Sequence, residues 1–280
     1  MAYEKIIYDI DQDGICRITL NEPERMNPLG WPLLTELDEA LRKSEKDDKV
    51  RVIIIKGAGR CFSAGYDLSH PQGFRGDEPK GRREYGNEGT WNSRAHVQGH
   101  IDYWFNDIWN LWKPVISQVH GFCLAGASEL ACICDLMVIS DNCRFGYPPT
   151  RFMATGDAIG LYAWHAGIKV AKEMAFGRVL SGKECVQYGF ANYSFPEDKL
   201  EEETTKIAKR IATIDPELLS LSKRQMCRNF DIRGFRVSVE YSGEFDSLSH
   251  KGRDFGYRKV IEQYGLAAGL KKLNEPWGGV

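Results

Sequence analysis

The sequence lacks the features of several protein classes. It has no basic excess, because 37 Lys and Arg residues stand against 39 Asp and Glu residues, whereas nucleic-acid-binding domains usually carry a positive surplus. No apolar run is long enough to span a bilayer, and residues 1–5 lack the charged-then-apolar layout of a secretory signal. We therefore expect a cytoplasmic globular protein with neither a nucleic-acid nor a membrane partner.

Cysteine is sparse, with eight residues in a chain of 280, which is too few for a small disulfide scaffold. Most lie in apolar sequence, where a thiol packs as a small hydrophobic group. The C-x-C pair Cys132 and Cys134 has no His at the spacing of a zinc finger. We expect reduced, buried thiols and no metal site.

Strand-like and helical patterns alternate along the first part of the chain. Two alternating runs flank the turn-forming segment Asp11–Gly14 and predict a β-hairpin. Leucines and alanines recur at helical spacing from Trp31 to Lys46. Mainly apolar stretches of strand length, typical of strands buried on both faces, occupy residues 50–55, 115–119 and 136–140.

This alternation indicates an α/β fold built from βαβ units. We divide the chain into a core of strands and helices, residues 1–195, and a helical C-terminal region, residues 196–280. Residues 69–94 are polar and rich in Gly, Arg and Glu, which fits either a loop near a pocket or a surface insertion. Residues 95–112 read as a helix with an aromatic stripe.

The segment from Gly121 to Ala131 carries the strongest chemical signal. Its small residues allow close approach to the backbone, and the first turn of the helix that follows offers unpaired N–H groups to an oxygen with negative charge. Glu129 comes three residues after Gly126, which places it near the same helix face. An oxyanion donor beside a proton carrier suits chemistry next to a carbonyl group.

Several motifs that follow one another along the chain resemble those of a known superfamily. Residues 21–29 resemble the N-x-P-x-x-x-N-x-L segment of the crotonase (enoyl-CoA hydratase/isomerase) superfamily, and residues 61–68 resemble its F-x-A-G-x-D-L loop. Residues 119–136 are similar to its glycine-rich block that ends in C-D, residues 145–148 to its F-G-x-P, and residues 181–192 to its later helix and strand. The blocks occur in order from about residue 5 to 265.

The resemblance implies a spiral ββα core, a helical C-terminal region that trimerises, often into a dimer of trimers, and acyl-CoA substrates. It implies that the backbone N–H groups of Tyr66 and Gly126 form the oxyanion hole, which general principles favour where charge develops on a carbonyl oxygen. It also implies that CoA, as part of the substrate, is bound near Ser63, Ala64, Asp67 and Leu68 at its adenine end. Arg25 stands where the family often places a basic residue near the CoA phosphates; alternatively, it is a solvated loop arginine.

The catalytic residues depart from the family pattern at one position. Glu129 matches the first hydratase glutamate, but Pro149 stands where the second would follow Pro148. Asp157 is a candidate substitute, because the related dehalogenases and naphthoate synthases keep an aspartate at or near this place. The alternative is that Asp157 caps a helix N-terminus, which Asp favours. A buried acid at position 129 must itself be paired or lie against a pocket.

The resemblance implies hydration of a 2-enoyl-CoA, with Glu129 and Asp157 as acid and base and no metal or redox cofactor. The alternatives are other reactions of the same superfamily, namely double-bond isomerisation, ring-opening C–C hydrolysis or, less well matched here, dehalogenation. A third reading is a non-catalytic acyl-CoA-binding protein, against which the retained oxyanion segments and Glu129 argue. The acyl group and the choice between trimer and hexamer are left open.

Overall fold

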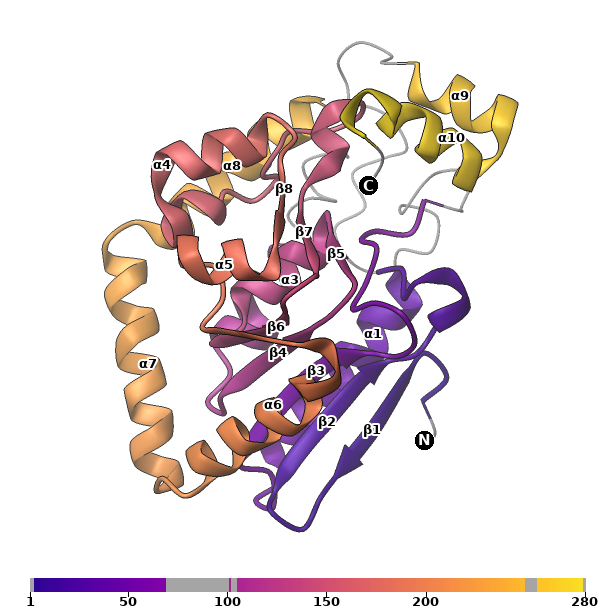
Figure 1. The fold of residues 1–280 in the computed structure, drawn as a ribbon. Helices are drawn as coiled ribbons and strands as arrows, with labels where there is room; N and C mark the ends of the chain where they lie inside the picture. Colours follow the sequence, from indigo (N-terminus) through magenta and orange to yellow (C-terminus); the bar gives the residue numbers. More distant parts are fainter. Residues whose placement is uncertain (1–2, 69–100, 102–104, 250–255, 279–280) are drawn as a thin grey trace.

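The computed structural model describes residues 3–68, 101, 105–249 and 256–278. The predicted loop at 69–94 and part of the predicted helix at 95–112 lie outside these ranges. Within the described part of that helix, Phe105–Trp109 forms a short π-helical turn. The remaining elements follow the alternation of strands and helices that the sequence indicates (Figure 1).

Six strands form the main sheet, in the order β1–β2–β3–β4–β6–β9. The predicted hairpin is confirmed, because β1 and β2 pair antiparallel with Ile6 opposite Leu20; the other neighbours are parallel. The strands are β1 (Ile6–Ile10), β2 (Ile15–Leu20), β3 (Val52–Gly57), β4 (Val115–Val119), β6 (Leu136–Ser140) and β9 (Tyr193–Phe195). Thus β4 and β6 have the bounds of their apolar runs, and β3 lies two residues later than predicted.

Helices cover both faces of this sheet, which explains why its central strands are mainly apolar rather than alternating between apolar and polar residues. In β3, Val52 and Ile54 pack against α6 (Glu197–Ala212) on one face of the sheet. Ile53 and Ile55 alternate with them and join the larger cluster, which contains α1 (Trp31–Lys46). The first helix of the C-terminal region therefore belongs to the packing of the sheet (Figure 1).

A second, three-stranded sheet has the order β5–β7–β8 and contains β5 (Phe122–Leu124), β7 (Arg144–Gly146) and β8 (Val179–Ser181). The chain leaves β4, bends at Gly121, forms β5 and then enters α3 (Gly126–Ile133). This succession of two strands and a helix is the ββα turn that the resemblance implies. All eight residues of α3 are buried, so the start of this helix is fixed on every side.

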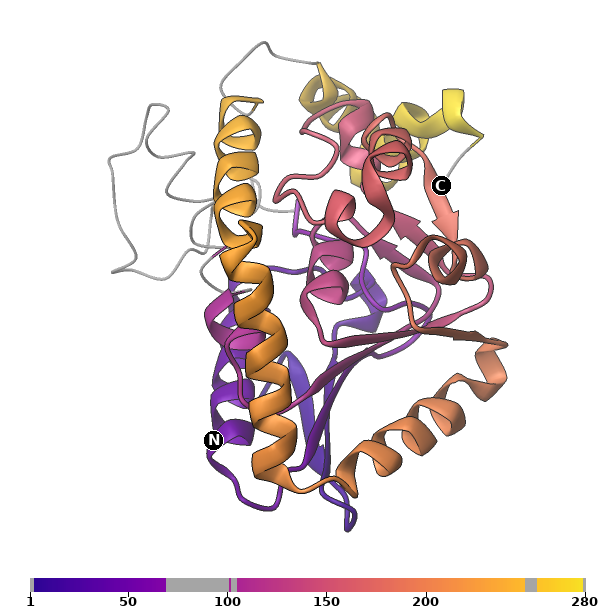
Figure 2. The same ribbon diagram turned by 90° about the vertical axis from the view of Figure 1, so that its left-hand side faces the viewer.

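The remaining helices lie around this core. They are α4 (Tyr162–Ala175), α5 (Gly182–Tyr188), α7 (Pro216–Ile232), α8 (Phe235–Ser249), α9 (Tyr257–Tyr264) and α10 (Leu266–Asn274). α7 begins at Pro216, and Gly234 lies between α7 and α8. Figure 2 shows α7 and α8 following each other along one side of the molecule. Among the described helices, none combines the length and apolarity that a membrane crossing requires.

Candidate active site

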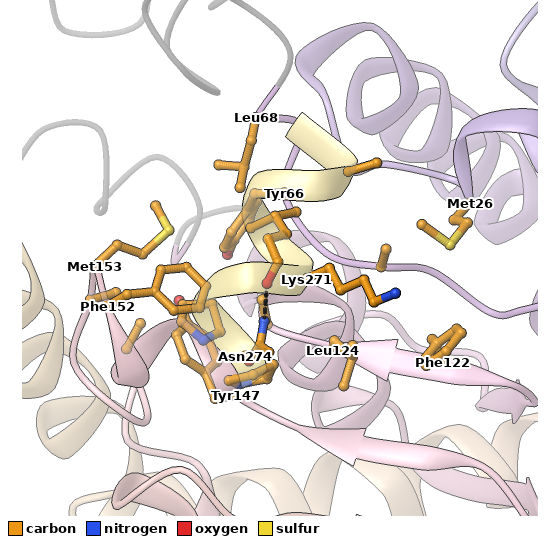
Figure 3. Close-up of a pocket in the computed structure, with 18 of the residues that line it drawn as sticks. Met26, Tyr66, Leu68, Phe122, Leu124, Tyr147, Phe152, Met153, Lys271 and Asn274 are labelled. Carbon is orange, nitrogen blue, oxygen red and sulfur yellow. Dashed lines mark hydrogen bonds between the residues drawn. The ribbon is translucent and has the colours of Figure 1, made fainter. Parts of the chain in front are cut away.

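A cavity of about 490 Å³ opens beside the start of α3, within the size range of small-molecule sites. Its wall is formed by the segment around residues 60–68, by the turn between β5 and α3, by residues 147–159, by α8 and by α10. Phe152 and Met153 lie at one end and Met26 and Phe122 at the other (Figure 3). Most of the lining side chains are aliphatic or aromatic.

The structure brings together the two glycine-containing segments that the sequence analysis singled out. Ser63 accepts a backbone hydrogen bond from the N–H of Leu124 at 3.3 Å. Gly65 has φ +101°, and a Cβ there would lie 2.6 Å from the carbonyl oxygen of Leu124. A Cβ on Gly126 would lie only 2.4 Å from Cζ of Tyr66. Glycine is therefore required on both segments for this close approach.

The turn into α3 carries local backbone strain. Ala125 has φ 52° and ψ −131°, a conformation that residues with a side chain rarely adopt. Its N–H donates to the carbonyl oxygen of Gly146 at 2.9 Å, so β7 holds the turn in place. Strain held by surrounding structure is common at functional sites, and here it sets the direction in which the N-terminus of α3 begins.

Glu129 lies in the first turn of α3 and is 0% exposed. Its Oε2 accepts a hydrogen bond of 2.7 Å from the hydroxyl of Tyr66, whereas Oε1 has no hydrogen-bond partner among the described residues. Burial raises the pKa of Glu129 to about 8, which exceeds the opposing effect of the Tyr66 hydrogen bond. A carboxyl group with such a pKa can exchange a proton near neutral pH.

Tyr66 connects this acid to the cavity. Its side chain lines the cavity wall (Figure 3). Its hydroxyl donates a hydrogen bond to Glu129, which is not itself a lining residue. The sequence analysis assigned Tyr66 a role only through its backbone N–H, and the side-chain contact was missed because residues 66 and 129 meet only in the fold.

Asp157 lies just before α4 and accepts hydrogen bonds from two backbone N–H groups. Oδ1 accepts from Leu161 at 3.0 Å and Oδ2 from Tyr162 at 2.8 Å. Asp157 thus binds backbone donors at the start of α4, although the N-cap residue of this helix is Leu161 and not Asp157. Burial raises the pKa of Asp157 to about 7, although both N–H groups act in the opposite direction. Asp157 does not line the cavity, but its neighbours Ala158 and Ile159 do.

Some of the residues expected to bind CoA line the cavity, and others do not. Ala64 and Leu68 line the cavity. Ser63 is fully buried, and its N–H and carbonyl groups are bonded to Phe122 and Leu124. Outside the cavity wall, Arg25 binds both carboxylate oxygens of Asp67, at 2.9 and 2.8 Å. Basic groups at the wall itself come instead from Arg60 and Lys271, neither of which the sequence analysis named.

One acidic site residue was also missed. Asp246, on α8, lines the cavity and is 3% exposed. The buried residues of α8 include Phe235, Val239 and Gly243 at intervals of four, and Asp246 follows on the same face. The sequence could have pointed to Asp246, because an acid on the apolar face of a helix is unusual and marks a candidate functional residue.

The chain was compared with known proteins. The family model for enoyl-CoA hydratase/isomerase matches residues 11–254. The mitochondrial enoyl-CoA hydratase domain-containing protein 3 of Rattus norvegicus is 32% identical over 90% of this chain and 80% of its own length. EchA13 of Mycobacterium tuberculosis is 32% identical over 89% of this chain and 81% of its own.

Solved structures agree with these matches. The crystal structure of an enoyl-CoA hydratase/isomerase from Xanthobacter autotrophicus Py2 superimposes with a TM-score of 0.85 at 31% identity, covering 98% of this chain and 99% of the other. The fold and the sequence therefore point to the same group of proteins.

Proposed function

Because the chain belongs to the enoyl-CoA hydratase/isomerase family, we propose that it catalyses the addition of water to a 2-enoyl-CoA thioester. The observation that carries the proposal is the buried Glu129, bonded to the cavity-lining Tyr66 beside the Gly126 segment. A proton carrier of raised pKa thus stands next to two segments that can present main-chain amides to a thioester oxygen.

In the proposed reaction, the thioester carbonyl accepts hydrogen bonds from the backbone N–H groups of Tyr66 and Gly126. Water adds to the β-carbon, electron density moves onto the thioester oxygen, and a proton is delivered to the α-carbon. Each preorganised amide contributes about 3 kcal/mol to such a transition state. Glu129 is the first acid or base, and Asp157 is the second candidate from the sequence. This reaction requires no redox cofactor, because water addition transfers no electrons to or from one, and it requires no metal ion where amide hydrogen bonds stabilise the oxyanion and carboxyl groups move the protons.

The CoA part of the substrate is proposed to leave the cavity at the end near Met26 and Phe122 (Figure 3). Two basic lining residues, Lys271 and Arg60, would supply positive charge for its phosphates, and the backbone of Arg60 lies against Gly121, next to Phe122. The opposite end, near Phe152 and Met153, is apolar and suits the acyl chain. The earlier assignment of Arg25 to the phosphates remains part of this proposal and is tested separately below.

The oligomer is proposed to be a trimer or a dimer of trimers. Supporting this, large apolar side chains on α7 and α8 are exposed, including Leu218 at 61%, Ile232 at 83% and Val237 at 68%, and both helices follow one side of the molecule (Figure 2). Exposed apolar surface of this kind marks an interaction surface. We also propose a cytoplasmic location, which the eight buried free cysteines support.

A panel of CoA thioesters tests the reaction. Hydration removes the absorbance of the conjugated enoyl group and adds the mass of water. Glu129→Gln is expected to lower kcat at least about 100-fold, the usual scale for a general acid or base, with CoA affinity nearly intact. Glu244→Gln, an exposed residue of α8, is the control. Parent-like activity of Glu129→Gln would remove Glu129 from the mechanism.

Isomerisation is the second candidate, because Pro149 lines the cavity at the position of the second hydratase glutamate and supplies no acid there. Unchanged mass with a moved double bond would identify it. Ring-opening hydrolysis would give the mass of water with cleavage of a cyclic acyl group. Binding of CoA esters without any turnover would favour a non-catalytic protein.

A further inference from the structure

The cavity contains an acidic side chain that the proposed mechanism has not yet used. Among the described residues that line the cavity, Asp246 is the one acid, and it is almost fully buried at 3% exposure. It projects from α8, more than one hundred residues after Glu129 in the sequence. A buried carboxylate in a largely apolar wall is costly, so its placement calls for a physical reason.

The carboxylate of Asp246 is held in a defined position. Its Oδ1 accepts hydrogen bonds from the backbone N–H of Thr155 at 3.2 Å and from the Thr155 hydroxyl at 2.8 Å. Thr155 directly follows Ala154, which also lines the cavity. Both donors act on one oxygen, so they orient the carboxylate against the wall segment while the residue as a whole still faces the cavity.

Asp246 also acts electrostatically on the acid already placed in the mechanism. After burial, which is the largest effect, the negative charges of Asp157 and Asp246 both raise the pKa of Glu129. Tyr147 is a buried lining residue, and its pKa is raised mainly by desolvation. The negative charges of Glu129 and Asp246 raise it further. Asp246 lines the same cavity as Tyr66, whose hydroxyl is bonded to Glu129.

The other candidate for a second acid is placed differently. Each oxygen of Asp157 accepts a backbone N–H at the start of α4, and Asp157 does not line the cavity. These bonds direct both carboxylate oxygens of Asp157 to backbone N–H groups at the start of α4. The position of the second hydratase glutamate is Pro149, which has no proton to exchange. A second carboxylate for water activation has to come from another element.

We propose that Asp246 is this second carboxylate, a catalytic residue that accepts a proton from the water attacking the β-carbon; the inference rests on the hydration proposed above. The O–H bond of water breaks as its oxygen bonds to the β-carbon, and the proton goes to Asp246. The π electrons move onto the thioester oxygen between the amides of Tyr66 and Gly126. As they return, the carboxyl proton of Glu129 bonds to the α-carbon. Asp246 then releases its proton to solvent and Glu129 takes one up, so that one water is added.

The test separates the two halves of this reaction. Exchange of the α-proton of a saturated acyl-CoA in D₂O requires the oxyanion hole and Glu129 but no water attack at the β-carbon. Asp246→Asn is therefore expected to lower kcat for hydration at least about 100-fold with KM little changed, while α-proton exchange continues. Glu129→Gln should lose both reactions. Glu244→Gln, on the exposed side of the same helix, is the matched control.

Asp246→Glu keeps the acid on a longer side chain and is expected to recover part of the rate that Asp246→Asn loses. If Asp246→Asn does not fold, Thr155→Val takes its place, since it removes one of the two donors that orient Asp246; it should lower kcat at unchanged KM. A parent-like kcat of the folded Asp246→Asn protein, or of Thr155→Val in its place, would overturn the assignment, as would a change in KM alone.

The failure of this inference is distinguishable from that of the proposed function. Parent protein that hydrates no enoyl-CoA overturns both. Parent protein that hydrates an enoyl-CoA, with Asp246→Asn equally fast, overturns only the role of Asp246. If Asp157→Asn instead loses hydration at an unchanged melting temperature, the second carboxylate is Asp157.

Discussion

Replacing Glu129 by Gln should change how stability depends on pH, whatever reaction the protein catalyses. The carboxyl group is 0% exposed, and burial raises its pKa from an ordinary value of 4.5 to about 8. Gln keeps the shape and an acceptor for the Tyr66 hydroxyl but has no proton to lose. The difference between the two proteins therefore isolates the ionisation of one group.

The sign follows from proton binding in the two states. Below about pH 4.5, the carboxyl is protonated in both the folded and the unfolded chain, so it adds no pH dependence. Between about pH 4.5 and 8 the unfolded chain has lost this proton, and the folded chain retains it. Unfolding then releases a proton, so the free energy of unfolding falls with rising pH by about 1.4 kcal/mol per pH unit. Above about pH 8 the fall levels off.

Over the interval from pH 5 to pH 8 this amounts to about 4 kcal/mol, a large part of the 5–15 kcal/mol that stabilises a typical protein. We expect Glu129→Gln to resist this loss and to unfold at higher denaturant concentration than the parent at pH 8. At pH 5 the two should be similar. The assay is urea unfolding of both proteins at several pH values and one protomer concentration, because association also affects stability.

Groups that titrate in both proteins cancel in the comparison. Two parallel curves of unfolding free energy against pH would show that Glu129 ionises with an ordinary pKa in the folded chain. The argument that burial holds a proton on Glu129 would then be wrong, and with it the proton-donating role given to this residue.

Three further predictions concern individual side chains. Tyr66→Phe removes the donor that lowers the pKa of Glu129, so the decline of kcat/KM at alkaline pH should move upward by about one to two units; an unmoved pH profile would show that the hydroxyl does not act on the acid. Asp157→Ala removes both side-chain acceptors at the start of α4 and should lower Tm by about 2–6 °C in a thermal melt, whereas an unchanged Tm with a lost rate would contradict a structural role for Asp157. Arg25→Ala should weaken CoA-ester binding a few-fold in calorimetry, on the scale of an exposed ion pair of about 0.2–1 kcal/mol; an unchanged Kd would mean that Arg25 serves contacts within the protein, such as those with Asp67 and Glu22.

Sequence patterns predicted the long elements of the fold because each carries its own physical signal. The strand Val115–Val119 carries three β-branched apolar residues and is buried along its whole length, and α1 repeats leucines at helical spacing. The three-residue strands β5, β7 and β8 were not predicted, since segments so short show no periodicity. Their pairing depends on neighbours that meet only after folding.

For a similar reason, only those site residues that lie close together in the sequence could be predicted from it. Glu129 and Gly126 stand together in one short segment, so their spacing on a helix was visible in the sequence. Asp246 reaches the cavity from a helix more than one hundred residues away, and only its place in the apolar pattern of that helix hinted at burial. The contact of the Tyr66 hydroxyl with Glu129 left no local pattern at all.

The packing of α6 has a practical consequence for shortened forms of this protein. A chain that stopped at residue 195 would uncover one face of the main sheet, where these side chains are now 0% exposed: Ile15, Val52, Ile54, Ile116 and Val138. At about 1.5–3 kcal/mol for each such side chain, their exposure would rival the whole stability of a typical domain. A truncation series that seeks the minimal active chain therefore has to retain residues through Ala212.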